Sequence, residues 1–256
     1  TWHGQIDHVL VYNYARTPAQ IAYDYNKGGP IGWWKFDECQ GSTAYDWSGN
    51  QNNGTIIIGS GGFQNSLGTC AVGTSAAWTN GSVGKINSSL NFDGSDDYML
   101  IPYSSVWKNK DFSASFWIKP SGSVDIETGY TSHWFYSPEG FGIVGYGGVW
   151  INNSSGRQSF SGCNFNNPNM WSHLTLTYNQ DTGIGKFYVN SKLNCSISLG
   201  AGTAIPWNTS SGIYVGGTDS GSYNGPGQID DIRIFPYALT SEQIKQIYNG
   251  GAVNFR

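Results

Sequence analysis

Two carboxylates in the stretch Ser123-Val124-Asp125-Ile126-Glu127 have the spacing of a hydrolytic pair. Residues two apart on a strand point to the same face, so Asp125 and Glu127 could reach one sugar ring, as in glycosidases that carry the pattern Glu-[Ile/Leu]-Asp-x-Glu. Ser123 stands where that pattern has its nucleophilic Glu, and the flanking Gly, Ser and Thr residues indicate a loop. The covalent step would lack its carboxylate, so we predict that the chain is not an enzyme.

The other groups that could do chemistry are scattered. The chain has four histidines, His3, His8, His133 and His173. They share no metal-ligand spacing, and no serine-nucleophile or phosphate-loop motif occurs. Two of them stand close to Trp134 and Trp171 in the sequence, which is more typical of packing than of catalysis.

The cysteines indicate an oxidising environment. They are Cys39, Cys70, Cys163 and Cys195, and none forms a Cys-x-x-Cys pair of the kind that binds zinc. Four cysteines allow three disulfide pairings. We expect the simplest, Cys39–Cys70 and Cys163–Cys195; the alternative is four buried thiols in a reducing compartment.

Glycosylation signals point the same way. Sequons of the form Asn-x-Ser/Thr begin at Asn53, Asn80, Asn87, Asn152, Asn153, Asn194 and Asn208. A chain this rich in Asn, Ser and Thr forms several by chance, so the sequons permit N-glycosylation without establishing it. Together with the expected disulfides they predict an extracellular or cell-surface location.

Composition limits the partners and the fold. Of the 256 residues only 12% are charged, against about 25% in ordinary soluble proteins. The net charge is −4 with no basic run, so nucleic acid is an unsuitable partner, and no apolar stretch approaches the roughly 20 residues that span a bilayer. The length suits one large all-β domain.

Strand-like runs follow one another from residue 33 onward. They are WWKFDE, SLNFDG, DYMLIPY, FSASFWIKP, FGIVGY, GVWINN, WSHLTLTYN, GKFYVN, SGIYVGG and IDDIRIF. Several alternate apolar and polar residues, and turn-forming Gly, Asn, Asp and Ser separate them. This pattern predicts an all-β fold, a two-sheet antiparallel β-sandwich of jelly-roll type. Helix is expected at residues 240–249, where Thr240 or Ser241 can cap the first turn.

The chain carries its own ending twice. Residues 4–29 align with residues 227–252 without a gap, at an offset of 223. The identical positions are Gly4, Gln5, Ile6, Asp7, Tyr14, Ala15, Thr17, Gln20, Ile21, Tyr25, Asn26 and Gly28. The opening segment therefore encodes one extra strand and one short helix, which cannot fold alone.

These motifs, in this order, resemble the concanavalin A-like, laminin G-like (LamG, pentraxin-type) jelly-roll domain of microbial surface proteins. The resemblance covers about residues 30–252 and rests on WKFDE with AYDWSGNQNNGT, SLNFDGSDDYMLIP, FSASFWIKP, WSHLTLTYN with GKFYVN, and GQIDDIRIFPYALTSEQIKQIYNGG. It implies two packed antiparallel sheets, an extracellular role in adhesion, glycan binding or spacing, and commonly a structural calcium ion.

By this resemblance, a calcium ion would tie the first strand region to the last. The candidate ligands are Asp37, Asp46, Asp93, Asp230 and Asp231. The alternative is that some of these carboxylates only cap turns, Asp93 beside Gly94 and Asp46 beside Gly49.

Aromatic residues offer platforms for sugar rings. The chain has 11 Trp and 16 Tyr. Among the Trp nearer to expected loops, Trp134 and Trp207 are our candidates for a glycan platform; the alternative is that each packs in the core.

Three interpretations of the opening segment remain open. It can be the end of a preceding LamG-like domain in a tandem array, with residues 28–30 as the joint. It can be an assembly strand that pairs with a sheet edge of a neighbouring copy, which builds a filament because a head-to-tail contact does not close. It can also fold back on its own domain. The residues of the assembly strand would be Ile6, Val9, Val11, Tyr12 and Tyr14.

We therefore expect a strand–helix segment at residues 1–29 and a LamG-like domain at residues 30–256. The expected function is a non-catalytic structural and adhesive module of a cell-surface array or filament, whose neighbours join through the N-terminal strand. Its partners would be other copies or adjacent LamG-like repeats. The alternative is a calcium-dependent, lectin-like module that binds glycans.

Overall fold

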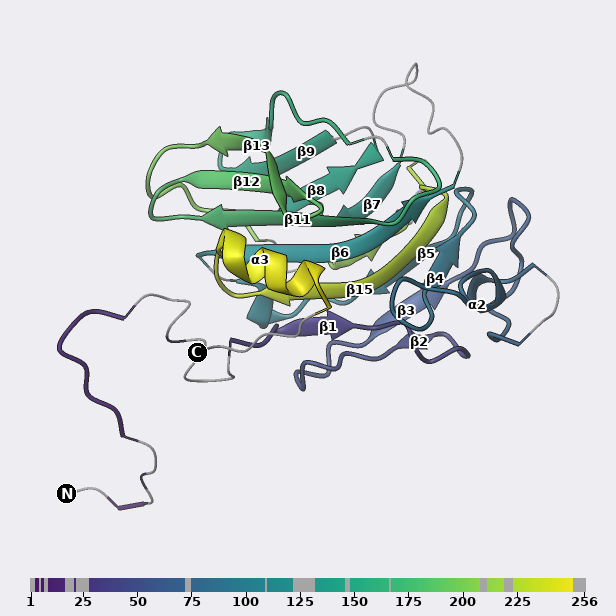
Figure 1. Ribbon diagram of the computed structural model, residues 1–256, viewed down its shortest axis with the longest axis horizontal. Coiled ribbons are helices and arrows are strands. Elements are labelled where there is room, and N and C mark those ends of the chain that lie inside the picture. The colour runs from purple at the N-terminus through teal and green to yellow at the C-terminus, as the bar shows by residue number, and fades with distance from the viewer. Residues whose placement is uncertain are drawn as a thin grey trace.

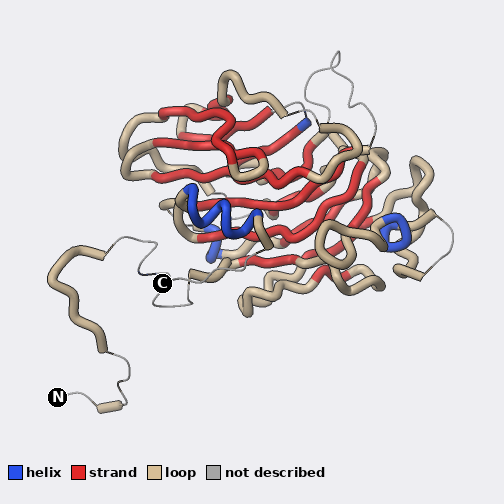
Figure 2. The backbone as a smooth tube through the Cα atoms, viewed as in Figure 1, coloured by secondary structure: helices blue, strands red, loops and turns tan. Residues whose placement is uncertain are grey.

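The structure is a computed structural model in which two antiparallel sheets pack face to face (Figure 1). It describes residues 3–4, 6, 9–16, 21, 28–71, 75–108, 110–121, 132–145, 148–165, 167–207, 211–218 and 223–250. Strands dominate the described chain and helices are few (Figure 2). The predicted all-β, two-sheet sandwich is confirmed.

In the first sheet β15 lies next to the edge strand β1. Its order is β1 (Gly32–Trp34), β15 (Gly227–Phe235), β6 (Phe112–Pro120), β11 (Ser172–Asn179), β12 (Ile184–Val189) and β13 (Lys192–Ser198), and β4 (Leu90–Phe92) also pairs with β15. The second sheet runs β10 (Gly156–Ser159), β9 (Gly148–Asn153), β8 (Phe141–Val144), β7 (His133–Tyr136), β14 (Ile213–Val215), β5 (Tyr98–Ile101), β3 (Gly54–Ile57) and β2 (Thr43–Ala44).

The core lies between the sheets, as alternation in the strands requires. Along β6 every second residue from Phe112 to Ile118 belongs to the core. Phe116 meets Phe135 of the second sheet edge to face, with ring centroids 5.5 Å apart, and Phe112 stacks on Phe141 at 5.1 Å. Such pairs join the two layers into one body.

The last strand and helix close this body; we call residues 227–250 the closing unit. Helix α3 (Ser241–Tyr248) lies across the outer face of the first sheet (Figure 1). It begins with a capping box, since Thr240 Oγ1 accepts from Gln243 N–H and Gln243 Oε1 accepts from Thr240 N–H. The apolar residues beneath it are Tyr188, Phe235, Tyr237, Leu239, Ile244 and Ile247.

The closing unit also covers polar residues of the first sheet. Ser113 Oγ donates to the carbonyl of Tyr237 and accepts from Leu239 N–H, both at 2.8 Å. His173 on β11 is buried beside the Tyr248 ring, 6.1 Å between centroids. Burial, and the nearby Arg233 charge, lower the pKa of His173 to about 3. The imidazole is therefore neutral at physiological pH.

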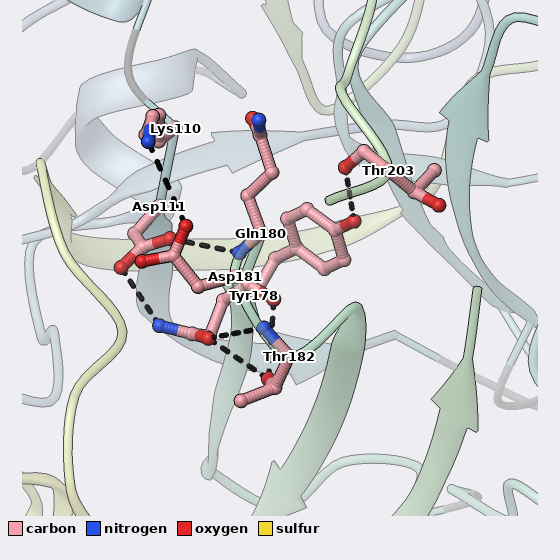
Figure 3. Close-up of polar contacts among 8 residues, drawn as sticks. Lys110, Asp111, Tyr178, Gln180, Asp181, Thr182 and Thr203 are labelled. Carbon is pink, nitrogen blue, oxygen red and sulfur yellow. Dashed lines mark hydrogen bonds and ion pairs between the residues drawn. The ribbon is translucent and has the colours of Figure 1, made fainter. Parts of the chain in front are cut away.

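A network of side chains holds the β11–β12 hairpin against the start of β6 (Figure 3). The Asp111 carboxylate accepts from Asn179 Nδ2 and from Gln180 N–H at 2.8 Å each. Asn179 in turn accepts from Thr182 N–H and Oγ1. The carboxylate is thus engaged in fastening the hairpin.

The two predicted disulfides are both present. Cys39 pairs with Cys70, and Cys163 with Cys195. A short helix, α2 (Ala77–Asn80), and a 3₁₀ turn, η1 (Ser105–Trp107), complete the described elements. Among the described residues, no helix has the length and apolar character needed to cross a bilayer.

Residues 9–16 of the opening segment stand away from the sandwich (Figure 1). Residues 9–16 form no strand pair with either sheet, so the described part of the expected N-terminal strand is not paired with this folded body. Most of the expected helix at residues 17–27 lies outside the described residues. The segment does not fold back over its described length, because Val11 is 91% exposed.

Candidate functional site

One candidate site is a group of three carboxylates beneath the loop of residues 59–64. Asp93, Asp96 and Asp97 follow β4, and their ligand atoms lie within 4.8 Å of one another. Five backbone N–H groups of residues 59–64 donate to these carboxylates at 2.8–3.0 Å. The loop is thereby drawn onto the acids.

Glycine makes that approach feasible. A Cβ on Gly59 would overlap the Asp96 carboxylate, and one on Gly62 would overlap Asp93. Gly62 also has φ +68°, a left-handed conformation that glycine adopts without strain. The sequence Gly59-Ser60-Gly61-Gly62 is therefore required by the carboxylates it covers.

The acidic group keeps unused capacity for a ligand. Burial raises the pKa of Asp97 to about 6, and the negative charge of Asp93 contributes to this rise. Asp96 Oδ1 is enclosed yet accepts no hydrogen bond from the described residues. Carboxylate oxygens are the ligands that Ca²⁺ prefers, so the residue types fit a hard cation.

A second candidate site is a polar cavity of about 300 Å³ where β1 meets β15. It is lined by Trp33, Lys35, Asp37, Ile86, Asn87, Asp230, Asp231, Arg233 and Gly250. Asp230 is fully buried; its Oδ2 accepts from Ile86 N–H at 2.7 Å, and its Oδ1 has no described partner. Burial raises the pKa of Asp230 to about 8, and the charges of Asp231 and Asp37 add to this.

Cations already neutralise part of this cavity. Arg233 pairs with Asp231 at 2.8 Å, and Trp33 Nε1 donates to Asp231 Oδ1 at 2.7 Å. The Arg233 guanidinium also lies over the Trp33 ring, 4.7 Å from its centroid. Asp231 is therefore bound to protein partners. This cavity suits a cation less well than Asp93, Asp96 and Asp97 with the loop of residues 59–64 that covers them, which together we call the acidic loop.

The predicted calcium ligands thus fall into separate places. Asp37, Asp230 and Asp231 line the polar cavity, whereas Asp93 belongs to the acidic loop. Asp46 is in neither: it accepts from the N–H groups of Trp33, Ser48 and Asn52 and from the Asn52 side chain. Asp46 therefore caps the turn beside Gly49, as the alternative interpretation of this carboxylate predicted.

A third feature is an aromatic edge beside β2. Tyr45 and Trp47 are 53% and 56% exposed. Lys35 lies between the Trp33 and Trp47 rings, 4.2 Å from each centroid. Glu38 accepts from Tyr45 N–H at 2.9 Å and from the Trp47 side chain, and burial raises the pKa of Glu38.

An open polar depression adjoins this edge. It measures about 490 Å³ and is lined by Glu38, Gln40, Gly41, Ser42, Thr43 and Tyr45. Glu38 Oε2 is enclosed and has no hydrogen-bond partner in the described chain. The arrangement places flat apolar rings next to hydroxyl, amide and carboxylate groups, which is the chemistry that sugar rings require.

Burial speaks against Trp134 as a glycan platform, whereas Trp207 is partly buried and stays a prediction. Trp134 is 2% exposed and packs edge to face on Phe165. Trp207 packs on Phe112 and Phe141 of the core. Both are near loops in the sequence, but Trp134 is buried in the core and Trp207 packs against it while partly buried. Trp47 is 56% exposed and is a better candidate for a platform. Sequence reasoning did not select it, because it lies within the family motif AYDWSGNQNNGT.

The sequons stay predictions. Asn87 is exposed and its amide donates to Asp37 at 3.2 Å, and the side-chain amides of the less exposed Asn80, Asn152 and Asn194 also donate to neighbouring residues. A glycan on any of these three would displace that contact. Asn53 and Asn153 are partly buried. Asn208 lies outside the described residues, as do the carboxylates at positions 125 and 127.

The opening segment and the closing unit differ sharply in burial. Ile229, Ile232 and Ile234 of β15 are 1%, 0% and 4% exposed. Their counterparts Ile6, Val9 and Val11 are 63%, 72% and 91% exposed. Three apolar side chains that the core would accept are therefore in solvent.

The fold defines an all-β two-sheet sandwich domain, and the comparisons assign its family. The model described as the concanavalin A-like lectin/glucanases superfamily (Laminin_G_3) matches residues 93–245, which is more than half of the chain. The chain belongs to this family.

Solved structures share the fold at low identity. Domain 4 of an extracellular arabinanase from Geobacillus stearothermophilus, in complex with arabinotriose, is 21% identical; the match covers 86% of this chain and 98% of that one, with a TM-score of 0.60. The binding domain of Paraclostridial Mosquitocidal Protein 1 is 17% identical (TM-score 0.59; 87% and 52% covered). The botulinum neurotoxin serotype D binding domain is 19% identical (TM-score 0.55; 87% and 51% covered).

A curated relative matches over a shorter span. The rat (Rattus norvegicus) sushi, von Willebrand factor type A, EGF and pentraxin domain-containing protein 1 is 26% identical over 149 residues, which is 53% of this chain. The match spans only 4% of that protein's length. It corresponds to one domain-sized part of a much longer chain.

Proposed function

We propose that this chain is a non-catalytic, extracellular structural and adhesive module that joins a neighbouring laminin G-like body through residues 1–29. The observation that carries the proposal is the exposure of Ile6, Val9 and Val11, whose counterparts in β15 are buried. An unpaired apolar segment is a liability for a chain that remains alone. A partner that buries it removes that liability.

Light scattering tests this proposal. We compare the intact chain with one that begins at Pro30, each alone and each mixed with a full-length Ile232→Asp variant whose own closing strand is impaired. The chain beginning at Pro30 is a fair control, because residues 9–16 pair with neither sheet; it also loses the Gly28 carbonyl that accepts from Tyr237 Oη. The intact chain is expected to form complexes in at least one of these samples, and the shortened chain in neither. Equal masses with and without residues 1–29 in all samples would contradict the proposal.

Carbohydrate binding is a second candidate function, and the aromatic edge favours it. Tyr45 and Trp47 expose ring faces beside the Glu38 depression, and the arabinanase domain with the same fold was solved with arabinotriose. Stacking on rings with flanking hydrogen-bond groups is a general way to hold a sugar. The proposed ligand class is a neutral polysaccharide.

Affinity electrophoresis in gels that contain arabinan or other neutral polysaccharides tests this candidate. Trp47→Ala and Tyr45→Ala should abolish the retardation of the intact chain. Phe63→Ala removes another exposed ring, 62% accessible, on the acidic loop and serves as the matched control. Retardation that survives both edge variants, or that Phe63→Ala abolishes as well, would exclude this edge as the platform.

Calcium would serve stability at the acidic loop. A cation held by Asp93, Asp96 and Asp97 would relieve their mutual repulsion and fasten the loop of residues 59–64. We expect millimolar Ca²⁺ to raise the melting temperature, because a ligand that binds only the folded state stabilises it. Asp96→Asn should remove the rise, whereas Asp181→Asn, at an exposed ion pair, should keep it. If Asp96→Asn keeps the rise and Asp230→Asn removes it, the ion belongs to the polar cavity instead.

A further inference from the structure

We infer that residues 4–29 are a second closing unit, which takes the β15 position in a laminin G-like body that lacks its own last strand and helix. The inference rests on the proposed function and names the partner and the mode of binding. It differs from strand addition at a sheet edge, in which any complete copy could serve as partner.

The place of β15 in the sheet requires such a partner. On one side β15 pairs with β6 from Gly227 to Phe235. On the other side it pairs with β4 at its start and with β1 at its end. The strand is thus hydrogen-bonded along both edges. A segment that copies it carries the pattern of an interior strand, buried on the core face and paired on both sides.

The copied strand retains the features that this position needs. Ile6, Val9 and Val11 stand at the three core positions of β15, and no Pro interrupts residues 4–12. Asp231 of β15 has φ +50° at a break in the register with β6. His8 occupies the corresponding position, and His is among the residues most tolerant of this conformation.

The copied helix retains its start but not its whole apolar face. Thr17 and Gln20 repeat the capping-box pair of α3, and Ile21 repeats the fully buried Ile244. Arg16 and Asp24, however, stand where the closing unit buries Leu239 and Ile247. The best partner is therefore a related body with polar groups facing these two positions, and a copy of this chain that lacks its own β15 should accept the segment more weakly.

Full-length variants test the position directly. The acceptor is the Ile232→Asp variant, and the donors are the intact chain, Val11→Asp and Leu10→Asp. Leu10→Asp is the matched control, because its counterpart Arg233 is a charged residue on the face away from the core. Native mass spectrometry should show a complex with the intact and Leu10→Asp donors and none with Val11→Asp. Donor variants Arg16→Leu and Asp24→Ile together should tighten the complex with this acceptor about tenfold.

An Ile232→Asp molecule can also insert its own residues 4–29 in place of its impaired β15. Gly28 already lies beside the closing unit, where its carbonyl accepts from Tyr237 Oη at 2.6 Å. A folded Ile232→Asp monomer that unfolds on adding Val11→Asp, but not Leu10→Asp, would support the same position. If Ile232→Asp precipitates, an extended chain replaces it, with residues 30–226 placed ahead of the full sequence. The upstream body should then resist protease, and Val11→Asp alone should make it sensitive. A protease-sensitive upstream body in the unsubstituted extended chain would overturn the inference.

The outcomes separate the inference from the proposed function. Complexes between intact copies that Val11→Asp abolishes would uphold the proposed function and overturn the interior position, since both partners then keep their own β15. No complex and no rescue in any sample would overturn both.

Discussion

The closing unit and the opening segment carry one sequence pattern in two environments. In the closing unit the pattern forms a strand paired on both sides and a capped helix over the outer face of the sheet. In the opening segment the same apolar positions lie in solvent. The difference teaches that these apolar positions are buried only where a body supplies both hydrogen-bonding edges and an apolar surface.

The largest expected effect compares the same truncation in the two regions. Ile232→Ala should lower the free energy of unfolding by about 2–5 kcal/mol, because it leaves a cavity at a fully buried position. Val9→Ala, at the matching exposed position, should change it by less than about 0.5 kcal/mol. Urea unfolding followed by tryptophan fluorescence measures both. A loss above 1 kcal/mol for Val9→Ala, on the order of a buried contact, would mean that the opening segment is packed in the isolated chain.

The next effect is the pH dependence of the free energy of unfolding that arises from His173, which is buried beneath the closing unit. The folded-state pKa of His173, about 3, lies below its ordinary value of 6.5, so between these values the unfolded chain binds more protons and stability falls as pH falls. From pH 7 to pH 5 the loss should be about 2 kcal/mol for one such group. The groups that face the imidazole ring are Trp117, Tyr248, Thr175 and Arg233. None of them is a carboxylate, so none stabilises the protonated ring by its charge.

Two variants separate this effect from a second buried histidine. His133, in the second sheet, has a pKa lowered to about 4 by burial and by Arg157. His173→Gln and His133→Gln should each flatten part of the pH dependence of unfolding. Only His173→Gln should also stop acid from exposing α3 to protease. If both variants have the same effect on α3, the pH response is not tied to the closing unit.

The sequence predicted the fold because its information is local and repeated. Alternation in stretches such as Phe112–Ile118 and an ordered set of motifs sufficed for a two-sheet sandwich, and the nearest-neighbour cysteine pairing proved correct. The sites were harder to predict because they depend on which loops meet. The loop of residues 59–64 closes on Asp96 and Asp97, although the hydrogen-bonded residues are 36 and 38 positions apart, a spacing that hairpin rules do not fix.

Burial of tryptophan was equally hard to predict, since proximity to a loop says little about packing. Trp134 belongs to a strand whose inner and outer faces are both covered, whereas Trp47 follows a buried aspartate and points outward. Large aromatic residues are often buried on average, so position in the chain alone could not separate platform from core.

The smallest expected effect compares the two capping boxes. Thr240→Ala removes the acceptor for Gln243 N–H and should lower the free energy of unfolding by about 1 kcal/mol. Thr17→Ala changes the identical residue of the copy and should leave unfolding of the isolated chain unchanged, because that helix has no body to close. In the complex with the Ile232→Asp acceptor, however, Thr17→Ala should weaken binding several-fold, while Ser105→Ala, at a surface turn away from both helices, should not. Calorimetric titration measures this change. A Thr17→Ala donor that binds as tightly as the intact chain would show that the copied strand binds without its helix, and would confine the second closing unit to residues 4–16.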